Sequence, residues 1–201
     1  MKAYCFLSAV AMRSEPSDRA EMVNQLLQDD TFEILKQTEK WSYIRCDYDG
    51  YEGWVDNKQW KPLTHPLPNP STDTSTSPAT YAEQHYLGVP YLWGGRTLMG
   101  IDCSGLTQVC YRACGVRLLR DASQKATQGI IIDNLYESQR DDLCFFCNEQ
   151  TRIIHVGIYM GDNRIIHSSG RVRIDTLTPE GIFNQELGTL THQLHSIRRM
   201  R

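Results

Sequence analysis

Hydrophobic and polar positions alternate along the first part of the chain. The segments FEILK (residues 32–36) and WSYIRC (residues 41–46) show this alternation, and polar turns such as DYDG separate the segments. A period of two is typical of strands that bury one face. The opening run MKAYCFLSAVAM is interrupted by Tyr4, Cys5 and Ser8 and lacks a convincing small-residue cleavage site, so it indicates a strand. The pattern predicts a small all-β barrel.

One break in composition divides the chain. Residues 64–80, THPLPNPSTDTSTSPAT, are rich in proline, serine and threonine and contain almost nothing to bury. Such a composition is typical of a linker. We therefore expect a first domain at residues 1–63, a linker at residues 64–80 and a second domain at residues 81–201.

The second half shows a mixed pattern of helix and strand, which predicts an α+β fold. One helix face is marked by apolar residues at the i, i+3, i+4 and i+7 positions: Leu106, Val109, Cys110 and Ala113. Cys103 then lies at or just before the first turn of this helix, with Asp102 or Cys103 itself as the capping residue.

Composition and charge exclude several classes of partner. The chain has 201 residues, of which 40% are hydrophobic, and a formal net charge of −3 at pH 7. This charge gives no basic field that would attract nucleic acid or anionic lipid, and no segment is long enough to span a membrane. We therefore expect neither nucleic acid nor a membrane as a partner, and the sequence leaves the oligomeric state open.

The seven cysteines do not form the dense framework of a secreted miniprotein. Their number is odd and they are scattered, so we expect a cytoplasmic location. Cys144 and Cys147 have the CxxC spacing of a zinc half-site. However, CFF resembles part of a buried strand and Cys110 belongs to the apolar helix face. We therefore expect no metal and no organic cofactor.

Cys103 is the candidate nucleophile. It stands in GIDCSGL, between Asp102 and Ser104, where a cysteine that only fills a core would have apolar neighbours. At the start of a helix, unpaired backbone N–H groups and the positive end of the helix dipole lower the pKa of a thiol. The same N–H groups can hold an oxyanion. A cysteine that merely opens the helix is the alternative.

Two histidines in strand-like segments are candidate bases. His155 stands in RIIHVGIYMG and His167 in RIIHSSG. In the first segment His155, Gly157 and Tyr159 share one strand face. Gly157 leaves room beside the histidine ring for another element to approach. A hydrogen-bonded structural histidine is the alternative.

The turn between these two strands decides whether the histidines share a face. GDNR (residues 161–164) predicts a hairpin. A two-residue loop would set His167 opposite Ile158, and the histidines would then point to opposite faces. A three- or five-residue loop centred on Asn163 would set His167 opposite Tyr159, on the same face as the other histidine. We predict the odd-length loop.

That arrangement predicts a triad of side chains. His155 takes the proton of Cys103, and His167 holds the second ring nitrogen of His155, as a carboxylate or amide does in other triads.

Several motifs together resemble those of a known family. GVPYLWGG, GIDCSGLTQ, DLCFF and HVGIYMGDNRIIHSSG, in this order, resemble the NlpC/P60 family of papain-like cysteine peptidases over most of residues 80–201. MRSEPSDRAEMVNQLLQDDTFEIL followed by DGYEGWV is similar to the bacterial SH3 (SH3b) domain. The resemblance implies a small SH3-like β-barrel followed by a papain-like α+β domain. It implies Cys103 as nucleophile, His155 as base, His167 as the orienting residue, and Tyr91 as a hydroxyl that helps to bind the oxyanion.

The two-domain arrangement is similar to that of γ-D-glutamyl-L-diamino acid endopeptidases, which act on peptidoglycan stem peptides with a free N-terminal L-alanine. The resemblance implies that Asp102, flanked by Ser104, holds the ammonium group of the substrate. In the first domain Tyr51 matches a substrate-contacting tyrosine, and Glu15 is a candidate second partner of the ammonium. A pair of desolvated carboxylates is costly alone but favourable around a cation.

The expected reaction is acyl transfer to Cys103, followed by hydrolysis of the thioester. The expected substrate is a peptidoglycan-derived peptide, with diaminopimelate or lysine as the diamino acid. Two alternatives stay open: a catalytically inactive module that binds wall peptides, and a papain-like acyltransferase or amidase that uses the same three residues.

Overall fold

The structure of the protein is a computed structural model that describes residues 1–68 and 72–200. It divides into two compact units, the first formed by Met1–Ser71 with Leu92–Thr97 and the second by Thr72–Tyr91 with Leu98–Arg201. Residues 69–71, which belong to the predicted linker, lie outside the described residues. In the part of the chain that is described, no helix has both the length and the apolar composition needed to cross a membrane.

The strands of the first unit form a seven-stranded sheet in the order β3-β2-β6-β5-β4-β1-β7, and neighbouring strands are antiparallel. The elements are β1 (Lys2–Cys5), β2 (Ala9–Arg13), β3 (Met22–Leu27), β4 (Thr31–Gln37), β5 (Trp41–Cys46), β6 (Glu52–Asp56), the 3₁₀ helix η1 (Asn57–Gln59) and β7 (Trp60–Pro62). The predicted SH3-like barrel is confirmed, and the opening run forms its first two strands.

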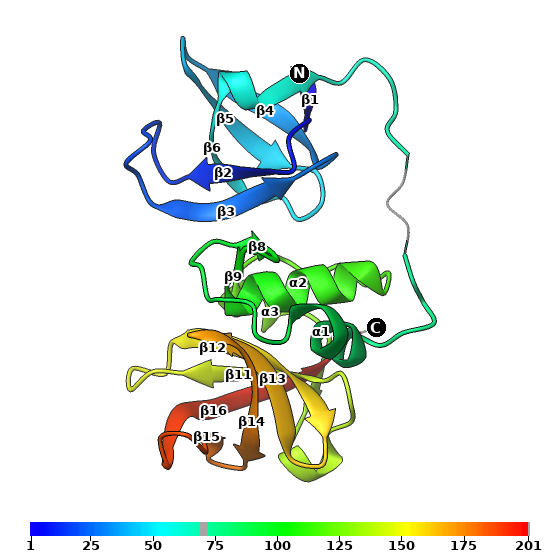
Figure 1. Cartoon of the computed structure of the whole chain (residues 1–201), viewed down its shortest axis with the longest axis vertical. Helices are drawn as coiled ribbons and strands as arrows, with labels where there is room; N and C mark the ends of the chain where they lie inside the picture. The colour runs from blue at the N-terminus through cyan, green and yellow to red at the C-terminus, as the bar shows by residue number, and fades with distance from the viewer. Residues whose placement is uncertain (69–71, 201) are drawn as a thin grey trace. The chain divides into compact units, whose positions relative to one another are not determined.

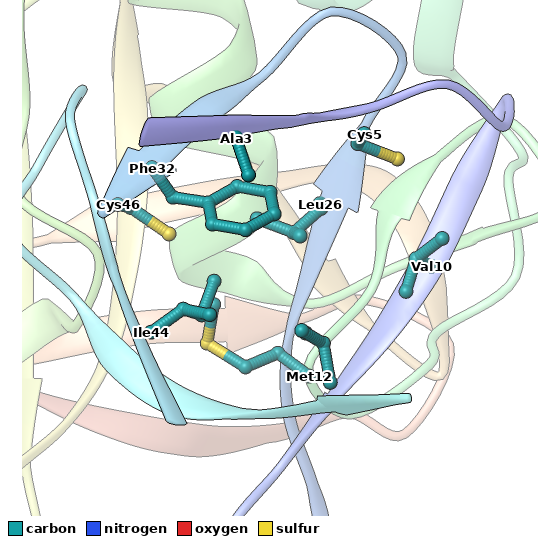
Figure 2. Packing of buried hydrophobic residues seen from close by; sticks show 9 residues of the cluster. Ala3, Cys5, Val10, Met12, Leu26, Phe32, Ile44 and Cys46 are labelled. Atoms are coloured by element: carbon teal, nitrogen blue, oxygen red, sulfur yellow. The ribbon is translucent and has the colours of Figure 1, made fainter. Parts of the chain in front are cut away.

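Alternation places the core of the first unit on one face of its strands. Ala3 and Cys5 of β1, and Ile44 and Cys46 of β5, are two residues apart and share the buried face around Phe32 (Figure 2). The whole cluster consists of Ala3, Cys5, Val10, Met12, Leu26, Phe32, Ile44, Cys46 and Val55. Burial of a large apolar side chain stabilises a fold by about 1.5–3 kcal/mol, so the alternating pattern both predicts and explains this barrel.

The segment Leu92–Thr97, with β8 (Arg96–Thr97), groups with the first unit. The guanidinium of Arg96 is buried and donates to the carboxylate of Asp30 at 3.1 Å and to the backbone oxygen of Gln25 at 2.8 Å. Sequence analysis assigns this segment to residues 81–201, because nothing in its composition signals a buried ion pair. The domain boundaries stay a prediction.

The second unit contains helices and a larger sheet. Its elements are α1 (Pro78–Tyr86), β9 (Gly100–Ile101), α2 (Cys103–Ala113), α3 (Ala122–Lys125), β10 (Ile130–Ile132), the 3₁₀ helix η2 (Leu135–Glu137), β11 (Leu143–Cys147), β12 (Ile153–Gly161), β13 (Arg164–Ser169), β14 (Arg171–Thr178), β15 (Gly181–Asn184) and β16 (Thr189–Arg199). Helix α1 starts inside the segment predicted as a linker, since Ser77 caps it and Pro78 occupies its first turn. The predicted helix after Asp102 is confirmed as α2.

The sheet of the second unit closes on itself. Its strand order is β10-β16-β11-β12-β13-β14-β15, and β15 also pairs with β16. Figure 1 shows the three helices gathered on one side of these strands, and α2 packs against β12. The apolar residues enclosed by the strands are Leu135, Cys144, Phe146, Tyr159, Ile165, Leu177, Ile182 and Ile197. His155 lies opposite Phe146 in the ladder, so its ring shares this enclosed face.

The hairpin between β12 and β13 corrects one prediction. Gly161 pairs with Arg164, so the loop has two residues, Asp162 and Asn163, both with positive φ as in a type I′ turn. The predicted odd-length loop is wrong. A β-bulge between Tyr159 and Gly161 inserts one extra residue and shifts the register, so that His167 lies opposite Gly157. The bulge therefore places His155 and His167 on the same face, whereas the two-residue loop alone would place them on opposite faces.

Replacing Asn163 with valine tests this turn. Its φ of 55° lies in the left-handed region, which costs a β-branched residue about 1–2 kcal/mol. We expect the free energy of unfolding to fall by about that amount in Asn163→Val, and to stay equal or rise slightly in the control Asn163→Gly. Urea unfolding followed by circular dichroism measures both. Equal stability of the valine variant and the native protein would contradict the two-residue turn.

Candidate active site

The candidate nucleophile stands at the first position of α2. Asp102 is the N-cap, and its carboxylate accepts a hydrogen bond from the Gly105 backbone N–H at 2.5 Å. Cys103 is only 7% exposed, and its thiol forms a hydrogen bond with the backbone of Val156. Since Val156 follows His155 in β12, this bond ties the start of α2 to the strand that carries the candidate base.

The pKa of the nucleophile departs from the prediction. Burial, and after it the negative charge of Asp102, raise the pKa of the Cys103 thiol to about 11. The bond with Val156 and the charges of Lys125 and Arg120 act in the opposite direction without outweighing burial. The predicted lowering of this pKa by the helix start is therefore wrong, because the cost of burying the thiolate is the largest contribution.

The two candidate histidines are in direct contact. His155 Nε2 and His167 Nδ1 are 2.8 Å apart, and both rings are buried. The second nitrogen of His167, Nε2, lies 3.0 Å from Asp175 Oδ2. Burial, with His167 and a further histidine nearby, lowers the pKa of His155 well below its usual value. The predicted contact between His155 and His167 is confirmed, and Asp175 extends it.

A third histidine, His192, stacks on the first. Its ring centroid lies 4.2 Å from that of His155, with an interplanar angle of 29°, and 5.8 Å from that of His167. Burial lowers the pKa of His192 to about 4, so its ring is neutral near pH 7. His192 also lines a cavity of about 490 Å³ between the β11–β12 turn and β16. His192 was not predicted from the sequence, because the polar stretch around it contains no motif.

Asp102 is ionised and paired. Its Oδ2 accepts from Arg120 Nη2 at 2.7 Å and its Oδ1 from Arg120 Nη1 at 3.1 Å. Ser104 Oγ donates to the same carboxylate at 3.1 Å and accepts from Arg120 at 2.5 Å. Burial alone would raise the pKa of Asp102, but Arg120 and the Gly105 N–H hold it below its usual value. The predicted substrate contacts of Asp102 and Ser104 stay predictions, and both residues already have internal partners.

Lys125 is a buried cation beneath the first turn of α2. Its ammonium donates to the backbone oxygens of Ser104 and Arg120, each at 2.7 Å. Burial, and after it the charge of Arg120, lower the pKa of Lys125 to about 7. Arg120 and Lys125 were not predicted as buried, because the segment RDASQK has the polar composition of an exposed segment.

Tyr91 belongs to the second unit and is partly buried. Burial raises the pKa of its hydroxyl, and the charges of Cys103 and Asp102 raise it further, so the phenol stays neutral at physiological pH and interacts electrostatically with the nucleophile. Its backbone N–H donates to the Gly170 oxygen at 3.0 Å, which anchors the segment. A neutral phenol is a hydrogen-bond donor, as the predicted oxyanion role requires; that role stays a prediction.

The two predicted substrate contacts in the first unit, Tyr51 and Glu15, differ in burial. Tyr51 packs against the apolar core of the barrel, and Glu15 is exposed. Their predicted contacts with substrate stay predictions.

The two cysteines with zinc-like spacing lie in β11, whose five residues are all buried. The predicted buried strand is confirmed. Within residues 1–68 and 72–200, no group of three or more histidine, cysteine, aspartate or glutamate side chains is arranged to hold a metal ion.

Comparison with known families identifies the class. The NlpC/P60 family matches residues 88–190, and the bacterial dipeptidyl-peptidase SH3 domain matches residues 12–59. The chain belongs to the NlpC/P60 family, and the predicted resemblance is confirmed for both parts.

Curated relatives share half or more of this chain. The gamma-D-glutamyl-L-lysine dipeptidyl-peptidase of Bacillus cereus is 32% identical over 115 residues, which cover 56% of this chain and 33% of the relative. The protein of the same name from Bacillus subtilis is 40% identical over 109 residues, covering 51% of this chain and 36% of the relative. The match thus spans about a third of the length of these relatives.

Solved structures support the fold. A crystal structure of an NlpC/P60 family protein from Bacillus cereus has a TM-score of 0.53 and 22% identity, covering 98% of this chain and 62% of the other. NlpC1 from Trichomonas vaginalis has a TM-score of 0.52 and 21% identity, covering 99% of this chain and 72% of the other. The predicted fold class, an SH3-like barrel followed by an NlpC/P60 domain, is confirmed.

The pH dependence of alkylation tests the state of the nucleophile. Because the pKa of Cys103 is raised, the thiolate fraction grows about tenfold per pH unit below that pKa. We expect the rate of iodoacetamide modification at Cys103 to keep rising from pH 7 to about pH 10, as measured by mass spectrometry of its peptide. The urea-unfolded protein is the control and should show an ordinary thiol pKa of about 8.5. A rate that levels off below pH 7 would contradict the raised pKa.

Proposed function

We propose that this protein is a cysteine endopeptidase that hydrolyses the γ-D-glutamyl-L-diamino acid bond of peptidoglycan stem peptides. The observation that carries the proposal is the 2.8 Å contact of His155 with His167, because His155 lies on β12, the strand whose backbone at Val156 forms a hydrogen bond with the Cys103 thiol. A thiol, a base and an orienting group in this order are the parts that acyl transfer needs. The names of the Bacillus relatives support the choice of bond.

Each side chain has a defined role in the proposed mechanism. His155 Nδ1, the ring nitrogen outside the contact with His167, takes the proton of Cys103 as the sulfur attacks the γ-carbonyl carbon. The Cys103 N–H and the Tyr91 hydroxyl stabilise the oxyanion. His155 then gives its proton to the leaving amine, and the thioester remains. Water, deprotonated by His155, attacks the thioester carbon; the C–S bond breaks, the γ-carboxyl product leaves, and His155 returns the proton to the sulfur.

Recognition of a free N-terminal L-alanine is part of the proposal. An ammonium group needs a carboxylate that stays ionised when it is buried. Asp102 meets this condition, since Arg120 and the Gly105 N–H hold its pKa below the usual value. Ser104, Glu15 and Tyr51 are the further proposed contacts of the substrate.

We also propose a cytoplasmic location, in keeping with a role in recycling of wall peptides. All seven cysteines are free thiols, which suits a reducing compartment.

Peptide cleavage tests the proposal directly. L-Ala-γ-D-Glu-diaminopimelate and L-Ala-γ-D-Glu-L-Lys are incubated with the protein beside their N-acetylated forms, and products are detected by mass spectrometry. We expect release of the diamino acid, with the free-amine peptides favoured roughly 10- to 100-fold, the range that one charge-assisted hydrogen bond accounts for. Cys103→Ala is the control and should release nothing.

Each other outcome has a definite meaning. Equal cleavage of free and acetylated peptides would contradict the ammonium site and leave the peptidase. Binding without cleavage would replace the peptidase with a wall-peptide binding module. Transfer of the acyl group to an added amine, in preference to hydrolysis, would replace it with an acyltransferase.

A further inference from the structure

A line of hydrogen bonds continues from the two histidines to the neighbouring strand. His167 Nε2 lies 3.0 Å from Asp175 Oδ2. The same Oδ2 accepts from Arg173 Nε at 2.7 Å, and Asp175 Oδ1 accepts from Arg173 Nη2 at 2.9 Å. Both His167 and Asp175 are at least 95% buried, so water does not compete for these bonds. The line runs through β12, β13 and β14 of one sheet.

The pairing of β13 with β14 explains how these groups meet. His167 lies directly opposite Arg173. Asp175 is two residues further along β14 and therefore shares its face, within diagonal reach of the histidine ring. Arg173 reaches along its own strand to grip the carboxylate at both oxygens, a bidentate contact that fixes the orientation of the carboxylate.

Asp175 is ionised. Burial would raise its pKa, but the hydrogen bonds that His167 and Arg173 donate, together with the charge of Arg173, hold the pKa below the usual value. An ionised carboxylate can only accept hydrogen bonds. The contact between His167 Nε2 and Asp175 therefore requires that Nε2 carries the proton.

The position of the proton on His167 then determines which nitrogen of His155 carries a proton. A neutral imidazole with a proton on Nε2 has an acceptor at Nδ1. His167 Nδ1 faces His155 Nε2 at 2.8 Å, so with a neutral His167 ring His155 Nε2 is the donor in that contact. His155 Nδ1 is then left with a lone pair. This is the nitrogen that a base needs in order to accept a proton.

We propose that Asp175 is a positioning residue that sets the tautomers of both histidines, so that His155 presents an unprotonated Nδ1 to the nucleophile. The inference rests on the proposed roles of Cys103 and His155. Asp175 touches neither of them and acts only through the ring of His167.

The neighbours of the two rings in the described part of the chain identify Asp175 as the group that sets the tautomers. Phe146 of β11 packs beside His155 and offers no hydrogen bond. His192 of β16 faces both rings by stacking and edge contact, and its own Nδ1 lies 2.9 Å from Thr191 Oγ1. Arg173 of β14 bonds the carboxylate. Among the side chains that the structure describes, Asp175 is the only carboxylate bonded to either ring.

Nuclear magnetic resonance of the substrate-free protein gives the first test, independent of any peptide. Long-range ¹H–¹⁵N spectra of histidine-labelled protein at pH 7 distinguish the two tautomers of each ring. We expect both His155 and His167 to carry the proton on Nε2. A proton on His167 Nδ1 in the native protein would overturn the proposal, and this measurement needs no folded variant.

The variant Asp175→Asn gives the second test. An amide can donate to His167 as well as accept, so we expect the spectra of both rings to show a loss of the Nε2–H form. We expect kcat to fall by about 10²- to 10³-fold with KM within about twofold, somewhat less than the loss when the tautomer-setting carboxylate contacts the base directly. Unchanged tautomers, or a lower kcat with native tautomers, would overturn the proposal.

Matched controls separate positioning from folding. Asp162→Asn makes the same substitution at an exposed turn position and should leave tautomers and kcat within about twofold of native. Thermal unfolding of both variants identifies any loss of structure. The two proposals fail separately: native tautomers with no cleavage of any peptide would reject the proposed function alone, whereas cleavage with the reversed tautomer would reject only the role of Asp175.

Discussion

The β-bulge near the end of β12 is the constraint on which the contact between His155 and His167 depends. A two-residue turn by itself sets His167 opposite Ile158, on the face away from His155. The extra residue between Tyr159 and Gly161 moves His167 opposite Gly157. Side chains in strands alternate between faces, so this single insertion decides whether the rings meet. The 2.8 Å contact and everything beyond it follow from that shift.

Gly157 has a defined part in the same geometry. A Cβ at this position would come within 2.7 Å of the Ile165 side chain and 3.0 Å of His167 Cβ. A larger residue would displace the histidine that lies opposite. The room that the glycine leaves is therefore occupied by the partner strand of the hairpin, and the bulge and the glycine together position the second ring.

The sequence predicted elements well wherever a pattern repeats over several residues. The alternation in the barrel, the apolar face of α2 and the buried strand β11 were all predicted, because each depends on short-range periodicity. Cys103 was chosen for its polar neighbours at a helix start, and His155 and His167 for their place in two strand-like segments that a turn connects. The loop length was wrong because a bulge leaves no mark in the hydrophobic pattern. Arg120, Lys125 and Asp175 were missed because a charged residue that will be buried looks the same in the sequence as an exposed one.

The pKa shifts of Cys103 and His155 link the structure to the proposed mechanism. Both pKa shifts at the reacting pair favour neutral forms, since that of Cys103 is raised and that of His155 is lowered. In the proposed mechanism the proton therefore moves to His155 as the bond from sulfur to carbon forms. Under the proposed function the ammonium of the substrate binds beside Asp102, whose charge opposes ionisation of the thiol. A cation at that carboxylate would weaken this opposition and lower the pKa of Cys103. The correct substrate would then activate the nucleophile that attacks it, while an acetylated peptide would leave the thiol in its resting state.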